Sequence, residues 1–200
     1  MSKPLILGST SPFRKELMQK LHIPFLTDSP DIDETRLEGE TPEDMVKRLS
    51  VGKAKKVAEN HPHSLIIGSD QCAVLEGEVM GKPGNHENAV AQLEKSSGKR
   101  VTFYTGLCLL DSETNKYQLD CIPFYVDFRT LSADEINHYL YIDKPYNCAG
   151  SFKSEGLGIT LFNKMQGDDP SSLIGLPLIR LCEMLRKHEV KLPPDAEPAE

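Results

Sequence analysis

Short apolar runs and stretches of helical periodicity alternate along the first half of the chain. Residues 5–7 and 65–67 are continuous apolar runs, which predict short buried strands. Ser11 and Pro12 are suitable as the N-cap and the first residue of a helix, and the apolar positions that follow them have helical spacing. A second helix is predicted over residues 41–60. Strands that alternate with helices indicate an α/β fold.

The second half of the chain continues the alternation. Further strands are predicted at residues 101–110, 122–128 and 156–162, and further helices at residues 88–95, 132–141 and 178–186. Ser132 and Glu135 form a capping-box signature at the start of the helix 132–141. Neither an internal repeat nor a clear linker interrupts the chain. We therefore expect a single domain over residues 1–190 and a disordered, Pro-rich, acidic tail over residues 191–200.

The composition narrows the class of protein. A chain of 200 residues can bury a sizeable core without disulfides or structural metals. Its 30 acidic residues against 23 basic ones give no general attraction for long nucleic acids, although a local basic cluster can still bind a small polyanion. The cysteines, Cys72, Cys108, Cys121, Cys148 and Cys182, are widely spaced, which favours reduced thiols. Because no run approaches transmembrane length, the sequence predicts a soluble, cytoplasmic protein without a membrane partner.

The loop after the first predicted strand is a candidate phosphate site. Ser9 and Ser11 flank a turn that enters a helix N-terminus, where free N–H groups and the helix dipole favour anions. Arg14 lies one turn further on, and its guanidinium can bind phosphate oxygens through two hydrogen bonds. An ordinary capped helix with an exposed arginine has the same pattern, so this loop alone leaves both interpretations open.

Two carboxylates are candidates for metal binding and acid–base chemistry. Asp70 follows an apolar run and Gly68, and we expect the strand to end there, where open α/β sheets bind ligands. A carboxylate at that place can bind a divalent cation or take a proton from water, but it can also cap a turn. Glu34 belongs to the acidic run 31–34, which is either simply solvated or a second source of hard oxygen ligands.

Two lysines are candidates for binding phosphate. Lys53 interrupts an apolar stripe on the second predicted helix, between Leu49 and Val57. Its ammonium group either reaches open water along its aliphatic stem or points into a cleft. Lys82 lies in a predicted turn at residues 81–83 and is equally ambiguous alone.

Together, and in this order, these fragments resemble the Maf family of nucleotide pyrophosphatases over nearly the whole chain except the tail. The motifs that carry the resemblance are Ser9-Thr10-Ser11-Pro12-Phe13-Arg14, Asp33-Glu34, Lys53, Gly68-Ser69-Asp70-Gln71, Gly81-Lys82-Pro83, Tyr104-Thr105-Gly106, Cys148-Ala149-Gly150-Ser151 and Ile174-Gly175-Leu176-Pro177-Leu178. The resemblance implies an elongated fold related to the inosine-triphosphate pyrophosphatases, with a central mixed sheet flanked by helices and a cleft between two lobes. It also implies a homodimer, which is common in the family, and hydrolysis of a nucleoside triphosphate to a monophosphate and pyrophosphate.

The resemblance assigns roles residue by residue. The residues that it implies for phosphate binding are Ser9, Ser11, Arg14, Lys53 and Lys82. Glu34 and Asp70 are implied to bind Mg²⁺ or Mn²⁺, and Asp70 is also implied to be the base that activates water. Such a displacement depends mainly on positioning and on stabilisation of charge, which these groups can provide.

Three positions depart from the pattern of the subgroup that acts on dTTP and UTP, which has Ser-Pro-Arg-Arg, Asp-Thr and Gly-Ile-Gln-Gly. Phe13, Gln71 and Glu155 stand there instead, and the segment 149–156 resembles the YceF-like subgroup, which prefers 7-methyl-GTP. We hypothesise that the Glu155 carboxylate accepts guanine N1–H and N2–H₂. The Phe13 ring would face the cationic, 7-methylated base, and Gln71 would bond the base or the ribose. The alternative is that Phe13 is a core residue and Glu155 a surface charge.

The expected function is hydrolysis of 7-methyl-GTP to 7-methyl-GMP and pyrophosphate, a house-cleaning reaction that removes a modified nucleotide from the pool. The sequence leaves two alternatives. One is a nucleotide-binding regulator of septum formation, because family members are associated with inhibition of that process. The other is a dTTP/UTP pyrophosphatase. The presence of Asp70, Glu34 and both lysines favours an enzyme, since a pure binding protein needs no base.

Overall fold

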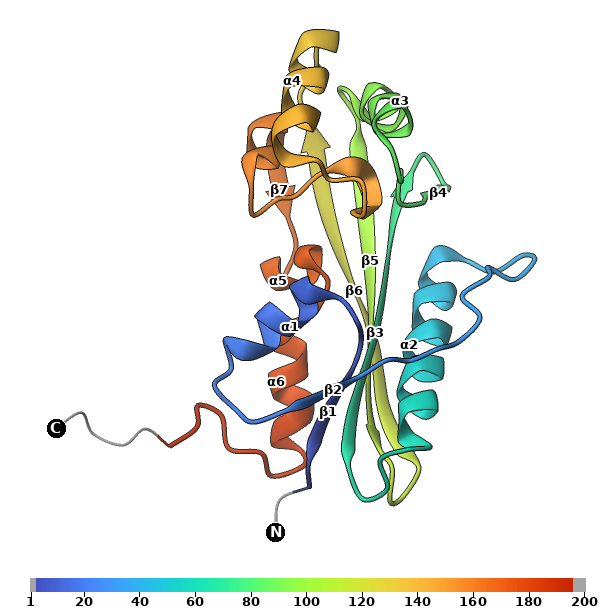
Figure 1. Cartoon of the computed structure of the whole chain (residues 1–200), viewed down its shortest axis with the longest axis vertical. Helices are drawn as coiled ribbons and strands as arrows, with labels where there is room; N and C mark the ends of the chain where they lie inside the picture. The colour runs from blue at the N-terminus through green and yellow to red at the C-terminus, as the bar shows by residue number, and fades with distance from the viewer. Residues whose placement is uncertain (1–2, 196–200) are drawn as a thin grey trace, which may run out of the picture.

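A long mixed sheet runs through the molecule from end to end (Figure 1). The computed structural model describes residues 3–195. Its strands are β1 (Leu5–Gly8), β2 (Leu26–Asp28), β3 (Leu65–Leu75), β4 (Glu78–Met80), β5 (Arg100–Asp111), β6 (Lys116–Phe128) and β7 (Phe162–Gln166). Their order is β2-β1-β3-β5-β6-β7, and β4 pairs with β3. β1 runs parallel to β2 and β3 whereas the other pairs are antiparallel, which confirms the predicted mixed sheet of an α/β fold.

Helices flank the sheet at both ends of this elongated molecule. They are α1 (Pro12–Gln19), α2 (Pro42–Ala58), α3 (His86–Ser96), α4 (Ala133–Asp143), α5 (Pro170–Ile174) and α6 (Leu178–Arg186). Figure 1 shows α2 on one face of the sheet, α1 and α6 on the opposite face, and α3 and α4 at the far end. We call the end with α1, α2 and α6 the lower lobe and the end with α3 and α4 the upper lobe.

Two apolar layers hold the lower lobe together. On one face α1 and α6 pack against the sheet in a cluster that includes Leu17, Leu181 and Ile67. On the opposite face α2 packs Val57 in a cluster with Ile66. Burial of each such aliphatic side chain stabilises the fold by about 1.5–3 kcal/mol. Both faces of the sheet are therefore covered, as the continuous apolar runs in β1 and β3 predict.

Aromatic side chains fix the irregular segment of the upper lobe. This segment contains two short 3₁₀ helices, η1 (Ala149–Ser151) and η2 (Leu157–Leu161). Phe152 meets Phe103 and Phe128 of the sheet edge to face, with ring centroids 5.4 and 5.6 Å apart. Such pairs contribute about 0.5–1.5 kcal/mol each beyond the area that they bury. The segment that follows η1 is thus anchored on β5 and β6.

Two glycines allow α2 to lie directly on the sheet. A Cβ at Gly68 of β3 would lie 2.1 Å from the main-chain oxygen of Ser50, and a Cβ at Gly106 of β5 would lie 2.4 Å from that of Val46. Any side chain at either position would push the helix away. This close approach brings the middle of α2 against the middle of β3, where Asp70 lies.

Most predicted elements are confirmed, with boundaries shifted by a few residues. α1, α2, α3, β5, α4 and α6 occur where the apolar periodicity predicts them, and β6 begins earlier than predicted, at Lys116. The predicted capping box is present, because Ser132 accepts from Glu135 N and Glu135 accepts from Ser132 N. The short elements β2, β4 and α5 were not predicted, since three to five residues give too little periodicity.

The predicted end of the strand at residues 68–70 is wrong. β3 continues to Leu75 and pairs with β5 along its whole length, with Asp70 opposite Gly106. Gly68 does not break the strand, because it serves the close approach of α2. Asp70 therefore lies inside a strand, and the interpretation of this residue as the cap of a turn is also wrong.

The strand predicted at residues 156–162 is wrong as well. Residues Leu157–Leu161 form η2, and β7 begins at Phe162. Gly158 explains the difference, because a Cβ there would lie 2.3 Å from the main-chain oxygen of Lys153. The chain folds back on itself at this point instead of extending.

Two expectations concern the chain as a whole. None of the helices within residues 3–195 has both the length and the apolar character needed to cross a membrane. Residues 191–195 of the expected tail form neither helix nor strand, and residues 196–200 lie outside the described part of the chain. The extent of the domain, residues 1–190, stays a prediction.

Candidate active site

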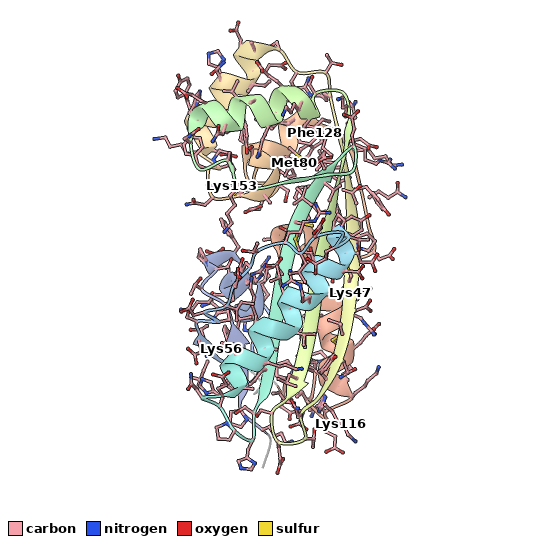
Figure 2. All side chains as sticks on the ribbon, turned by 90° about the vertical axis from the view of Figure 1, so that its right-hand side faces the viewer. Lys47, Lys56, Met80, Lys116, Phe128 and Lys153 are labelled. Atoms are coloured by element: carbon pink, nitrogen blue, oxygen red, sulfur yellow. The ribbon has the colours of Figure 1, made fainter. Side chains whose placement is uncertain are left out.

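A cleft with a volume of about 670 Å³ is lined by residues of both lobes. Figure 2 shows Lys153 and Met80, both lining residues, on the side of the upper lobe. All ten residues that the sequence suggested for the site line this one cleft: Ser9, Ser11, Phe13, Arg14, Glu34, Lys53, Asp70, Gln71, Lys82 and Glu155. The fold thus brings together side chains from α1, α2, β3 and four loops.

The N-terminal loop forms a hydrogen-bonded corner of the cleft. Ser9 Oγ accepts from Ser11 N at 3.1 Å, and Ser11 Oγ caps α1 by accepting from Arg14 N at 3.4 Å. Arg14 Nε donates to the Gly175 carbonyl oxygen at 2.7 Å, and its Nη1 donates to Ser9 Oγ at 3.5 Å. The guanidinium is therefore held in a fixed orientation at the helix N-terminus, where the dipole also favours an anion.

The surroundings of Arg14 affect its pKa in two directions. Desolvation lowers the pKa of the guanidinium, while the charges of Asp70 and Glu34 act to raise it. An arginine side chain nevertheless stays protonated in proteins. Arg14 is thus a permanent, partly desolvated cation, and such a group interacts strongly with a phosphate that replaces water around it.

Lys53 joins the two acidic residues of the site. Its Nζ lies 2.6 Å from Asp70 Oδ1 and 2.9 Å from Glu34 Oε1. Lys53 is 6 % exposed, so the alternative in which its stem carries the ammonium to open water is wrong. Lys53 therefore points from the apolar stripe of α2 into the cleft, and its ammonium group pairs with both carboxylates.

Asp70 is fixed by its main chain as well as by its ion pair. Its N–H donates to Ser50 Oγ at 3.0 Å, and Ser50 Oγ in turn donates to the Val46 carbonyl oxygen of α2 at 2.6 Å. The Asp70 side chain is 12 % exposed, and the residue lines the cleft. A largely buried carboxylate at the edge of a cleft can accept a proton from a water molecule that enters the cleft.

The acidic residues Glu34 and Asp70 are oxygen ligands of the kind that Mg²⁺ takes from proteins. Glu34 and Asp70 both reach one ammonium group, so their oxygens converge on a common region. Within residues 3–195, no group of three or more His, Cys, Asp and Glu side chains is placed to hold a metal ion. Mg²⁺ commonly takes one or two carboxylates from the protein and its other ligands from phosphates and water. Asp33 is turned aside and accepts from Thr35 N at 2.9 Å.

The residues suggested for base recognition have different surroundings. Phe13 is half-buried and belongs to none of the apolar clusters formed by the described residues, so the alternative of a core residue is wrong. Glu155 is exposed on the upper wall. The Gln71 amide nitrogen already donates to Ser172 O at 2.7 Å and Thr105 Oγ1 at 3.0 Å. Its amide oxygen is the part of Gln71 that a nucleotide can use.

Comparison with known proteins identifies the family. The family described as "Maf-like protein" matches residues 4–188. The chain belongs to the Maf-like family. Its relatives include the 7-methyl-GTP pyrophosphatase of Colwellia psychrerythraea, 56 % identical over 94 % of each chain. The protein of the same name from Pseudomonas aeruginosa is 51 % identical, over 94 % of this chain and 98 % of the relative.

A solved structure supports the Maf-like fold independently of the sequence. The Ham1 protein of Staphylococcus aureus superposes with a TM-score of 0.52 over 94 % of this chain and 100 % of its own, at 14 % identity. At that identity the similarity concerns the fold alone. It agrees with the elongated sheet and two lobes expected for this chain.

The thiols that border the Maf-like cleft are not activated nucleophiles. Burial raises the pKa of Cys72 to about 12, and it also raises the pKa of Cys148 above its ordinary value. Both groups therefore stay neutral at physiological pH and act as small apolar parts of the wall. The charged groups of this Maf-like cleft are therefore its carboxylates, lysines and arginine.

Sequence reasoning missed two groups that shape the Maf-like site. Ser50, which accepts from Asp70 N, is a second polar residue in the apolar stripe, three residues before Lys53. That spacing places both on one face of α2 and was an available signal. The Gly175 carbonyl accepts from Ser69 Oγ at 3.2 Å as well as from Arg14. The φ angle of Gly175 is 131°, which strongly favours glycine, but the sequence does not reveal its partner.

Proposed function

We propose that this protein hydrolyses 7-methyl-GTP to 7-methyl-GMP and pyrophosphate. The observation that carries the proposal is the composition of the cleft, which has phosphate-binding cations and carboxylates in the lower lobe and Phe13 and Glu155 on its walls. The relatives that are more than 50 % identical over almost the whole chain are named for this activity, which supports the same assignment.

The cations of the cleft bind the triphosphate and the departing pyrophosphate. Arg14 and the N-terminus of α1 provide donors on one side, and Ser9 and Ser11 add hydroxyl groups. Lys53 contacts phosphate from the lower lobe and Lys82 from the upper lobe. Charge that develops on the leaving pyrophosphate is thus stabilised by groups that are already oriented.

Asp70 is the base in this mechanism. It accepts a proton from the water that attacks the α-phosphorus, and the bond between the α-phosphorus and the bridging oxygen breaks as pyrophosphate leaves. Ser50 holds the main chain of Asp70, and Lys53 holds its Oδ1, which fixes the carboxylate relative to the phosphates. Positioning of this kind, together with stabilisation of charge, supplies most of the acceleration in such displacements.

Glu34 and Asp70 would hold a divalent cation, Mg²⁺ or Mn²⁺. When bound, the cation neutralises phosphate charge and lowers the pKa of water in its coordination shell. Lys53 contacts the same two carboxylates, so its ammonium shares them with the cation or shifts toward phosphate.

Base selection is assigned to the Phe13 ring and the Glu155 carboxylate. Methylation of N7 gives guanine a positive charge, which a carboxylate attracts and an aromatic face stabilises by about 1–2 kcal/mol when desolvated. Neutral pyrimidines gain neither interaction. Gln71 contributes through its amide oxygen and by holding the α5 turn.

We also expect the protein to act in the cytoplasm and to form a homodimer. The described cysteines are free thiols, which fits a reducing compartment such as the cytoplasm. A homodimer is expected, and light scattering on the purified protein would measure its mass.

The reaction is tested by identifying the products. The protein is incubated with 7-methyl-GTP and Mg²⁺, with and without EDTA, and nucleotide and phosphate products are separated by chromatography. We expect 7-methyl-GMP and pyrophosphate in equal amounts, and none with EDTA. Release of inorganic phosphate with 7-methyl-GDP, or no reaction at all, would overturn the proposal.

A further inference from the structure

The end of α4 lies behind the turn that presents Glu155. Tyr139 and Asp143 are four residues apart on α4, so their side chains leave the helix on the same face. Tyr139 is only 3 % exposed, although it carries a polar hydroxyl group. Neither side chain lines the cleft, whereas residues 153–155 do. Their contacts with the segment 153–156 connect them to the cleft wall.

The Tyr139 hydroxyl lies against the main chain of the segment that carries Glu155. It accepts a hydrogen bond from Lys153 N at 2.9 Å. A Cβ at Gly158 would lie 2.3 Å from the Lys153 carbonyl oxygen and 3.1 Å from the same hydroxyl oxygen, so a residue without a side chain is required there. The two ends of the segment 153–158 thus lie close together beside the Tyr139 hydroxyl.

Asp143 holds the same segment from a second point. Lys153 Nζ donates to the Asp143 carbonyl oxygen at 2.8 Å. A Cβ at Gly156 would lie 2.9 Å from Asp143 Oδ2, which shows how closely the turn is pressed against α4. Within the turn, Gly156 N donates to Lys153 O at 3.3 Å. Because Glu155 itself is exposed, its direction is set by this supported backbone.

The Tyr139 phenol keeps its proton at physiological pH. Burial raises its pKa most, and the neighbouring Asp143 carboxylate raises it further, while the hydrogen bond from Lys153 N lowers it. The hydroxyl is therefore a constant acceptor for the main chain of the turn.

We propose that Tyr139 is a positioning residue for base recognition, because its hydroxyl fixes residues 153–156 so that the Glu155 carboxylate faces the cationic base. The inference rests on the proposed function, since it assumes that Glu155 selects 7-methyl-GTP. Tyr139 does not touch the nucleotide and takes no part in the cleavage of the phosphate bond.

The test compares two substrates in the Tyr139→Phe variant. This change removes the hydroxyl and keeps the buried ring. We expect kcat/KM for 7-methyl-GTP to fall about fivefold, the loss typical of one hydrogen bond, through a raised KM. The kcat and KM for UTP, which the Glu155 carboxylate does not select, should change less than about twofold. If Tyr139 had only a structural role, kcat/KM would fall for both substrates together.

Tyr146→Phe is the matched control. Its hydroxyl is also in the upper lobe, but it donates to Leu140 O at 3.4 Å and lies 3.0 Å from His86 Nδ1, away from the turn. This variant should leave the ratio of kcat/KM values for 7-methyl-GTP and UTP unchanged. Thermal unfolding of all variants checks that they are folded at the assay temperature.

A double-mutant cycle with Glu155→Gln decides how Tyr139 acts. If Tyr139 works through Glu155, Tyr139→Phe adds no further loss of the ratio in the Glu155→Gln background. The positioning role would be overturned if the two substitutions lowered the ratio additively in the double variant. It would also be overturned if Tyr139→Phe lowered kcat/KM equally for both nucleotides, or left their ratio unchanged. If Glu155→Gln lowers the ratio while Tyr139→Phe does not, the proposed function stands and this inference falls. If the wild-type protein hydrolyses no triphosphate, the proposed function itself has failed.

Discussion

Lys53 links the two carboxylates on which the proposed chemistry depends. Its contacts of 2.6 Å with Asp70 and 2.9 Å with Glu34 make one group out of residues from α2, β3 and the loop before α2. A buried ammonium needs such partners, because an unpaired charge at this depth would be expensive to desolvate. Removal of either carboxylate leaves the other to pair with Lys53.

We predict that Asp70→Asn abolishes most of the activity and preserves the fold. The amide cannot accept the proton of the attacking water, so kcat should fall by about 10²–10⁴-fold, measured as pyrophosphate release from 7-methyl-GTP. Glu34 still pairs with Lys53, so the thermal midpoint should change by only a few degrees.

Asp127→Asn is the control for this prediction. Asp127 is a strand residue paired with Arg100 at 2.6 Å, and it does not line the cleft. It should keep wild-type turnover. A fully active Asp70→Asn protein would remove Asp70 from the role of base.

For the single residue Lys53, the sequence predicted its position in the apolar stripe but not its contacts. A lysine in an apolar stripe marks an unusual site, yet both outcomes for its ammonium are compatible with the pattern. The outcome is decided by Gly68 and Gly106, which let α2 lie close enough for Lys53 to reach Asp70. Ser50 was missed although it shares a face of α2 with Lys53, because its partner is a main-chain group of another element.

The contact between α2 and the sheet is the element that sets the geometry of the site. Replacing Gly106 by alanine places a Cβ 2.4 Å from the Val46 carbonyl oxygen, and main chain cannot yield as a flexible side chain can. We predict that Gly106→Ala lowers the free energy of unfolding by about 1–3 kcal/mol or more, measured by urea denaturation. Gly81→Ala is the control, because a Cβ there meets nothing within 4 Å. Equal stability of the two variants would contradict the close approach.

The loop that carries Glu34 is anchored on α2 by a bidentate pair. Arg48 Nε and Nη2 donate to the two Glu40 carboxylate oxygens at 2.6 and 2.8 Å, and Nη2 also donates to Thr35 O at 3.1 Å. The hydrogen bonds from Arg48 are the largest effect that lowers the pKa of Glu40, from 4.5 to about 2. This pair fixes the residue next to Glu34 and so limits where Glu34 can lie.

We predict a pH-dependent loss of stability in Glu40→Gln. Because the pKa of Glu40 is lower in the folded state, the pair stabilises the fold fully above pH 4.5, and this stabilisation is lost as the pH falls toward about 2. At pH 7 the free energy of unfolding of the variant should be about 1–2 kcal/mol lower than that of the wild type. The difference should shrink steadily below pH 4.5. A difference that is constant from pH 7 to pH 3 would show that the carboxylate charge contributes nothing.

Helices and strands were predicted best where a regular apolar pattern extends over many residues. They were predicted worst where tertiary contacts determine the type or the end of an element. α2 and β5 follow from 17 and 12 residues of regular pattern. β3 was cut short because Gly68 resembles a strand end, although its purpose is to admit α2. η2 was predicted as a strand because nothing local reveals that Gly158 packs against Tyr139.

The whole molecule combines a negative surface with a cationic cleft. The chain carries a net charge of −7, yet the residues lining the cleft include Arg14, Lys53, Lys82, Lys144 and Lys153 against three carboxylates. Such a distribution repels long polyanions and attracts a compact one into the cleft. The overall architecture was predictable because resemblance to a family adds information that local patterns lack. The contacts inside the cleft needed the structure, since its walls come from distant parts of the chain.

The central claim is that this cleft selects a cationic guanine base for pyrophosphate release. The most direct test is the kcat/KM of the wild-type protein for 7-methyl-GTP compared with GTP, dTTP and UTP under one set of Mg²⁺ conditions. We predict that the kcat/KM for 7-methyl-GTP exceeds the value for every other nucleotide by about tenfold or more. A tenfold difference corresponds to about 1.4 kcal/mol of selective interaction. Equal values for all four, or a higher value for dTTP or UTP, would contradict the account.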